Sequence, residues 1–123
     1  MRFITDRKRA IGMGSAKSGT DHFWRVKIQS FALLLLIPLF IFTVGPQLGN
    51  SHAEVIAYFQ KPFPALVAAL TIAVGMFHFR DGAQVLIEDY VHGLAQKITL
   101  MIMIVFSYAV AAIGLFAIAR LAL

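Results

Sequence analysis

Three long runs of apolar residues dominate the chain, and short polar segments separate them. The runs cover residues 26–44, 65–86 and 98–119, and the third contains no charged side chain. An α-helix rises about 1.5 Å per residue, so roughly 20 residues cross a hydrocarbon core of about 30 Å. The pattern therefore predicts an all-α membrane protein with three transmembrane helices. We expect these helices to pack with a companion subunit into a helical bundle.

The segments between the runs carry helix boundary signals. Ser18 to Asp21 favours a helix start, because hydroxyl oxygens accept bonds from free backbone amides and an acidic side chain suits the positive helix end. Ser51 and Glu54 have the spacing of a capping box, which predicts a short helix that we place at the membrane interface.

Two further features predict how the spans bend and connect. Pro38 lies inside the first run and frees a backbone carbonyl one turn earlier, so we expect a mild kink there. The connection at residues 91–96 is short, so the third helix should pack antiparallel to the second.

Composition supports a bilayer environment. Of the 123 residues, 59% are hydrophobic and 14% are charged, and a water-soluble domain of this size could not cover so much apolar surface. We expect residues 1–123 to form a single anchor domain.

Cysteine is absent, which excludes disulfides and an iron-sulfur cluster held by this chain. Another protein of the same complex would have to deliver any electrons that the chain handles.

The positive charge lies at the N-terminus. Residues 1–27 contain seven Lys and Arg, including Arg2 and Lys17, but two Asp. Beside apolar runs, such a cluster predicts a cytoplasmic N-terminal arm, residues 1–25, and a C-terminus on the opposite side. No nucleic-acid-binding module matches the rest of the chain, so we expect no nucleic acid partner.

The second run carries the residues best suited to chemistry. In a helix, the eleven steps from His78 to Asp89 return to within about 20° of the same face, roughly 16 Å along the axis. Gly75 and Gly82 share that face, so a flat group could approach the backbone beside the imidazole.

His78 is the histidine inside an apolar run, whereas the other three lie at ends or in loops. An intramembrane ionisable group usually serves a function, and a histidine between small residues suits b-type haem ligation. A neutral imidazole that hydrogen-bonds a neighbouring helix is the alternative. No other histidine in the sequence lies at a matching depth, so the second haem ligand would come from another chain.

Arg80 and Asp81 interrupt the same run. They form either a local ion pair, with Arg80 reaching toward the headgroups, or a site in which Arg80 neutralises a haem propionate. Asp89 and Tyr90 are either an ordinary polar helix end or a quinone site, where a tyrosine hydroxyl holds a quinone carbonyl and the carboxylate guides protons.

The sequence resembles the small hydrophobic membrane anchor of succinate dehydrogenase, respiratory complex II. The most specific part of the resemblance is the second-span pattern His78-x-Arg80-x-Gly82-x-Gln84-Val85, followed by Glu88-Asp89-Tyr90-Val91-His92-Gly93. Residues 14–20, with His22 and Trp24 close behind, resemble the same segment in the bacterial branch closest to mitochondria.

The resemblance implies a site and a set of partners. His78 would be an axial ligand of haem b, whose other ligand is a histidine of the companion cytochrome b anchor. Tyr90 would hydrogen-bond ubiquinone, with Asp89 beside it. Electrons from succinate would arrive through a flavoprotein subunit and an iron-sulfur subunit. The chain would catalyse nothing alone, and would serve the tricarboxylic acid cycle and respiratory electron transport.

Two other functions remain open on the sequence. A haem-free anchor of a fumarate reductase would use His78 for packing, and a small transporter or channel subunit would line a polar path with Arg80 and Asp81. We expect the bacterial inner membrane rather than the mitochondrial one, because the basic arm is short for a transit peptide and contains Asp6.

Overall fold

The structure is a computed structural model that describes residues 3–15 and 18–123, so the predicted charges at Arg2 and Lys17 lie outside it. In chain order its elements are α1 (Asp6–Ile11), α2 (Asp21–Val44), the 3-10 turn η1 (Gly45–Gln47), α3 (His52–Phe59), α4 (Pro62–Tyr90) and α5 (Gly93–Ala122). No strand occurs in the described ranges, which confirms the all-α prediction.

Three of these helices are long and apolar enough to cross a membrane: α2 with η1, α4 and α5. This confirms the three predicted transmembrane helices. The helices extend beyond the apolar runs, since α4 has 29 residues and α5 has 30. The limits of the spans, the cytoplasmic arm and the single anchor domain stay predictions, as does the orientation.

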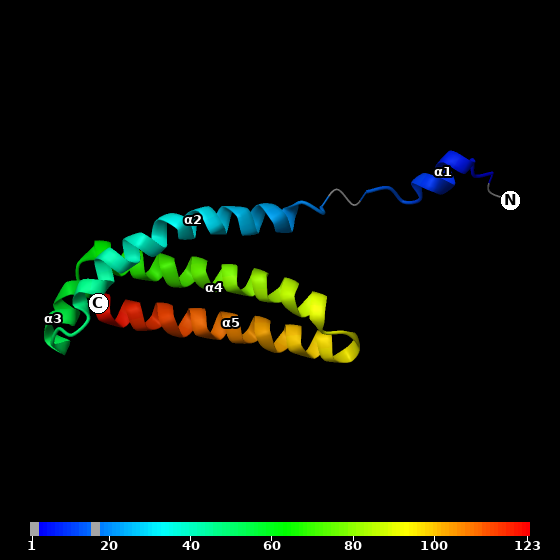
Figure 1. Ribbon diagram of the computed structural model, residues 1–123. Coiled ribbons are helices and arrows are strands. Elements are labelled where there is room, and N and C mark those ends of the chain that lie inside the picture. The colour runs from blue at the N-terminus through cyan, green and yellow to red at the C-terminus, as the bar shows by residue number, and fades with distance from the viewer. Residues whose placement is uncertain (1–2, 16–17) are drawn as a thin grey trace.

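Helix α4 is the central element of the bundle. It packs against α2 on one side and α5 on the other, and α5 runs antiparallel beside it (Figure 1). Close packing uses small residues, with Ala68 of α4 almost fully buried. Between α4 and α5, a Cβ added at Gly114 would lie 3.0 Å from Ile72 Cγ2. Side chains on α4 can therefore contact α2 on one side and α5 on the other.

The α4–α5 connection is shorter than the expected residues 91–96. Helix α4 continues to Tyr90 and α5 begins at Gly93, so two residues connect them. Gly93 has a φ of 69°, a conformation that costs other residues energy because their Cβ approaches the carbonyl. The antiparallel arrangement was predicted correctly, but the length of the turn was wrong.

The start of α2 agrees with the sequence, although its capping does not. The helix begins at Asp21, but the preceding Thr20 makes no side-chain capping bond. Its backbone is already helical, with φ −91° and ψ −9°, whereas a capping residue normally has an extended backbone. Further along, α2 continues through Pro38, so this proline does not end the helix.

The predicted capping box forms at the start of α3. The Ser51 backbone N–H and hydroxyl donate to the Glu54 carboxylate at 2.8 and 2.6 Å. These bonds hold the pKa of Glu54 below its ordinary value. At the other end of α3, the Tyr58 hydroxyl donates to the Thr43 carbonyl at 2.9 Å. Helix α3 is thereby attached to the end of α2.

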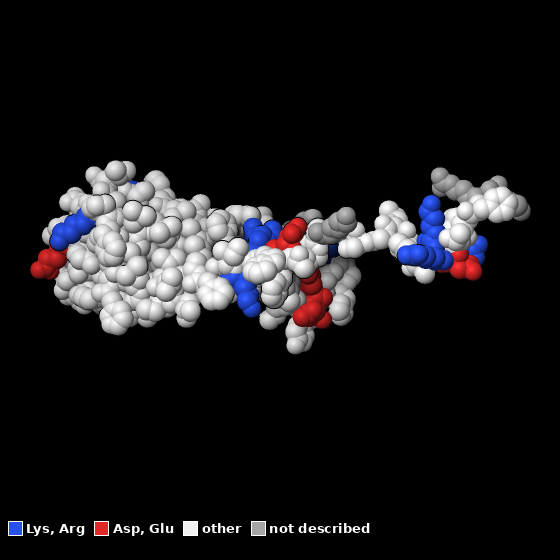
Figure 2. Space-filling model, turned by 90° about the horizontal axis from the view of Figure 1, so that it is seen from above, with Lys and Arg blue, Asp and Glu red and all other residues white. Residues whose placement is uncertain are grey.

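Charged side chains avoid the middle of the bundle surface. In the face shown in Figure 2, Lys, Arg, Asp and Glu gather toward the ends of the bundle and on α1, and the long central part is free of them. Large apolar side chains remain exposed along all three long helices. Such a surface suits lipid or another apolar helix rather than water.

Candidate functional site

A groove between α2 and α4 contains His78. It has a volume of about 430 Å³. Apart from His78, the α2 side chains Ser30, Leu33, Leu34, Ile37 and Pro38 line it. The imidazole is half-buried and is the one titratable group along this groove. The surroundings are therefore apolar, with a single nitrogen base at one wall.

The imidazole has an unmet hydrogen-bonding need. Within the described ranges, Nδ1 of His78 is buried and has no hydrogen-bond partner. A buried polar atom without a partner costs roughly 1–3 kcal/mol. None of the described residues hydrogen-bonds the imidazole, so its other ring nitrogen, Nε2, is left for a group from outside this chain, such as a metal or a polar atom of another protein.

Space beside the imidazole is open along α4. A Cβ added at Gly75 or Gly82 would meet no atom within 4 Å. Both glycines were predicted to share the face of His78, so a flat group could lie against the helix backbone there. Larger side chains at these two positions would occupy that space.

A second pocket adjoins the groove toward the start of α2. It also measures about 430 Å³ and shares Ser30 with the groove. Its lining includes His22, Lys27, Asp81 and Gly82, and Nε2 of His22 is buried without a partner in the described chain. The sequence placed His22 at an end or in a loop, outside the candidate site. Nothing in its spacing indicated that it would line this pocket.

Arg80 and Asp81 lie in a polar chain that crosses all three spans. The guanidinium of Arg80 donates to Asp81 Oδ1 from Nε at 2.9 Å and from Nη2 at 2.6 Å. Arg80 Nη1 contacts the Tyr108 hydroxyl of α5 at 2.5 Å. On the α2 side, Gln29 Nε2 donates to Asp81 Oδ2 at 3.0 Å. Asp81 is 1% exposed, so its charge is enclosed by these partners.

The predicted local ion pair of Arg80 therefore forms. Three of the five N–H donors of a guanidinium are engaged in these bonds, which leaves two for another acceptor. The haem propionate interpretation stays a prediction. Neither Tyr108 nor Gln29 was among the candidate residues of the sequence analysis. A polar side chain inside an apolar span was the signal that could have identified both.

Asp89 and Tyr90 lie at the end of α4 and point to no partner in the described chain. Both side chains are exposed, Tyr90 to 80%. Nearby, Gln96 Nε2 donates to the Glu88 carbonyl at 3.2 Å, which ties the first turn of α5 to this end. Tyr90 lies twelve residues beyond His78 on the same helix, about 18 Å along its axis. The two predicted sites are therefore separate.

The described residues contain no group of three or more His, Asp or Glu side chains that could hold a metal ion. A haem needs a different arrangement, since its porphyrin already binds the iron and the protein adds one or two axial ligands. The unpartnered imidazole, the open glycine flanks and the apolar groove fit such a group.

These features define a class of protein: an integral membrane protein of three spanning helices, whose central helix carries a histidine without a partner beside an apolar groove. Residues 1–118 match the succinate dehydrogenase/fumarate reductase transmembrane subunit family. The chain belongs to this family, as the resemblance of the second span predicted.

Individual relatives agree with the family. The chain is 43% identical to the succinate dehydrogenase hydrophobic membrane anchor subunit of Paracoccus denitrificans, over all of this chain and 95% of that one. It is 32% identical to the succinate dehydrogenase membrane anchor subunit of Reclinomonas americana, over 72% of this chain and 76% of that one. The hydrophobic membrane anchor subunit of Rickettsia conorii is 29% identical over 83% of this chain and 82% of its own length. No solved structure matches the chain.

The family narrows the functions left open by the sequence. Membership of this family, and relatives that are all named succinate dehydrogenase membrane anchor subunits, favour an anchor over a transporter or channel subunit. An anchor has partners in its complex, and the three apolar helices embed the chain in a membrane. The bonds of Arg80 and Asp81 join α2, α4 and α5 to one another.

Proposed function

We propose that this chain is the hydrophobic anchor of a bacterial succinate:ubiquinone oxidoreductase, where it holds one side of a haem b and part of the quinone-reduction site. The single observation that carries the haem assignment is that His78 lines an apolar groove and its imidazole has no hydrogen-bond partner among the described residues. The full-length similarity to a named succinate dehydrogenase anchor supports the assignment to that complex.

His78 would hold the haem iron, and a histidine of the companion cytochrome b anchor would supply the second protein ligand. The open backbone at Gly75 and Gly82 leaves room for the flat ring, and the apolar α2 side chains would exclude water from it. Arg80 keeps two N–H donors for a propionate. When bound, the haem would supply a one-electron redox centre.

Tyr90 and Asp89 bind the substrate ubiquinone at the end of α4. The Tyr90 hydroxyl donates a hydrogen bond to a quinone carbonyl, and the adjacent Asp89 carboxylate receives protons from water and passes them on. Reduction of a quinone takes up two protons with two electrons, so an exposed carboxylate beside the hydroxyl suits the reaction. The exposure of both side chains supports this role.

The orientation follows from the basic N-terminal residues, which stay on the cytoplasmic side. Helix α2 starts there, so the end of α4 with Tyr90 faces the cytoplasm as well. The flavoprotein and iron-sulfur subunits dock on that face of the bacterial inner membrane and deliver electrons from succinate. The companion anchor covers exposed apolar surface that includes α2, where 6% of the most apolar window is buried.

The decisive experiment compares haem spectra of the purified complex with and without His78→Tyr. Optical and EPR spectra, normalised to the amount of assembled anchor, should lose or change the low-spin b-haem signal. His92→Gln is the matched control, because His92 lies at the α4–α5 connection, and it should leave the signal intact. An unchanged signal in an assembled His78→Tyr complex would return His78 to a packing role. A haem-free fumarate reductase anchor predicts no b-haem signal in any of these complexes.

A further inference from the structure

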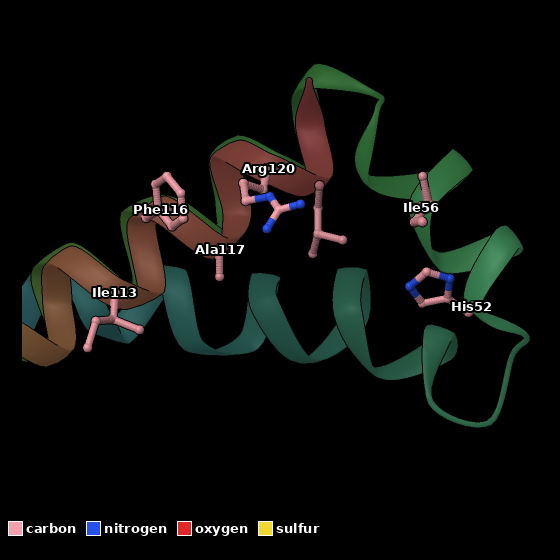
Figure 3. Close-up of a pocket in the computed structure, with 7 residues that line it drawn as sticks. His52, Ile56, Ile113, Phe116, Ala117 and Arg120 are labelled. Atoms are coloured by element: carbon pink, nitrogen blue, oxygen red, sulfur yellow. The ribbon is translucent and has the colours of Figure 1, made fainter.

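A groove at the opposite end of the bundle from Tyr90 has a charged end and an apolar floor. It measures about 490 Å³ and lies between the start of α3 and the last turns of α5. Its lining residues are His52, Ile56, Ile113, Phe116, Ala117, Arg120 and Leu121. Figure 3 shows the Arg120 and His52 side chains extending from their two helices toward the space between them. Two nitrogen-bearing side chains thus flank a groove whose other lining residues are apolar.

Arg120 is a cation without a counter-charge in the part of the chain that the structure describes. Within residues 3–15 and 18–123, the one ion pair joins Arg80 and Asp81, and Arg120 makes no hydrogen bond. The acidic residue of α3, Glu54, does not pair with Arg120. Its carboxylate accepts hydrogen bonds from Ser51 instead. Arg120 is exposed, so its guanidinium can accept an anion from outside.

The position of the groove matches the level of lipid phosphates. Helix α5 has 30 residues, about 45 Å, which exceeds a hydrocarbon core of about 30 Å. Its last turn, with Arg120, therefore reaches the headgroup layer. From Arg120 back to Ile113 the groove follows α5 for about 10 Å, into the depth that the acyl chains of one leaflet occupy.

We propose that this groove binds one anionic phospholipid. Its phosphate is bound by Arg120, with a hydrogen bond from the His52 imidazole, and one acyl chain lies along Ile113, Phe116 and Ala117. The exposed apolar side chains of α5 need a hydrocarbon neighbour, and the cationic end selects one that carries a negative phosphate. The site is independent of the haem and the quinone, since it lies at the other end of α4.

The test measures retained lipid on the intact purified complex by native mass spectrometry. The unmodified complex should retain one phosphatidylglycerol more than the Arg120→Gln complex. Ala117→Trp, which fills the floor of the groove, should lose the same lipid. Lys61→Gln is the control of equal charge change at the same end of the bundle, outside the groove, and should retain it.

Titration of the delipidated complex distinguishes the other occupants. Phosphatidylglycerol should bind about fivefold more weakly to Arg120→Gln, the effect of one basic residue near a membrane surface, and inorganic phosphate should not displace it. Equal retention by Arg120→Gln and Ala117→Trp would overturn the proposal. Displacement of the lipid by inorganic phosphate would also overturn it. So would an Arg120→Gln complex that loses the companion anchor but keeps the same number of bound lipids.

Discussion

The side-chain amide of Gln29 on α2 donates a hydrogen bond to the carboxylate of Asp81 on α4, with 3.0 Å between Nε2 and Oδ2. The same carboxylate accepts from Arg80, which reaches Tyr108 on α5. One enclosed aspartate thus connects the three spanning helices. In a bilayer, these polar groups have no water to replace a lost partner, so each depends on the others.

Replacing Asp81 with leucine should destabilise the assembled complex by about 3 kcal/mol, because it leaves the Arg80 charge unpaired in an apolar region. Gln29→Leu should cost less, roughly 0.6 kcal/mol, the average for a hydrogen bond between membrane helices. Unfolding in a graded denaturing detergent measures both variants.

The double variant Arg80→Leu with Asp81→Leu is the control for this prediction. Removing both charges should restore much of the lost stability, since apolar residues can replace a buried ion pair at little cost. A double variant as unstable as Asp81→Leu would show that the aspartate stabilises the bundle by a route other than its pairing with Arg80.

Replacing Tyr90 with phenylalanine should lower ubiquinone reduction at least about tenfold, because the quinone carbonyl loses its hydrogen-bond donor. Haem content and succinate oxidation with an artificial electron acceptor should stay unchanged, and these two measurements serve as internal controls. Tyr58→Phe is a matched control at the opposite end of the bundle and should leave quinone turnover intact. Normal ubiquinone reduction by Tyr90→Phe would remove this hydroxyl from the site.

Adding a methyl group at Gly114 should weaken the contact between α4 and α5. The new Cβ would lie 3.0 Å from Ile72 Cγ2, and a β-branched side chain in a helix has little rotamer freedom to retreat. We expect Gly114→Ala to cost roughly 1 kcal/mol in unfolding experiments. Combining it with Ile72→Ala removes the atom in the way, so the two changes should be less than additive.

Acidification should loosen the first turn of α3. The pKa of Glu54 is lowered by the bonds from Ser51, so the ionised carboxylate stabilises the folded helix start. That contribution is complete above the usual glutamate value of about 4.3 and is lost as the pH falls through the lower folded value. Hydrogen exchange at the amides of α3 measures this loss. Glu54→Gln should exchange with little pH dependence in the same range, after correction for the intrinsic rate.

The spans and the capping box could be predicted from the sequence because each depends on local chemistry. Apolar runs of sufficient length must cross a membrane as helices, whatever their neighbours are. Ser51 and Glu54 form their bonds within one turn, so their spacing alone specifies the contact. The open flank at Gly75 and Gly82 follows from helical periodicity in the same way.

The contacts between helices could not be predicted, because they depend on how each helix is rotated about its axis. Apolar residues cover α5 on every side, so periodicity does not show that Tyr108 faces Arg80. Gln29 lies 52 residues before its partner Asp81, and nothing in the spacing indicates the pair. The α2 side chains beside His78 could not be predicted either, because the rotation of α2 about its axis decides which of them face α4.

The two-residue connection between α4 and α5 has a consequence for biosynthesis. Helices joined so closely enter the bilayer as a hairpin, since neither can be displaced far from the other during insertion. Tyr108 on α5 is then available to Arg80 as soon as both helices are in place, while Asp81 is already paired with its neighbour. Two ionisable side chains can thus leave the translocon as a neutral unit, whether or not α2 has yet packed against them to supply Gln29.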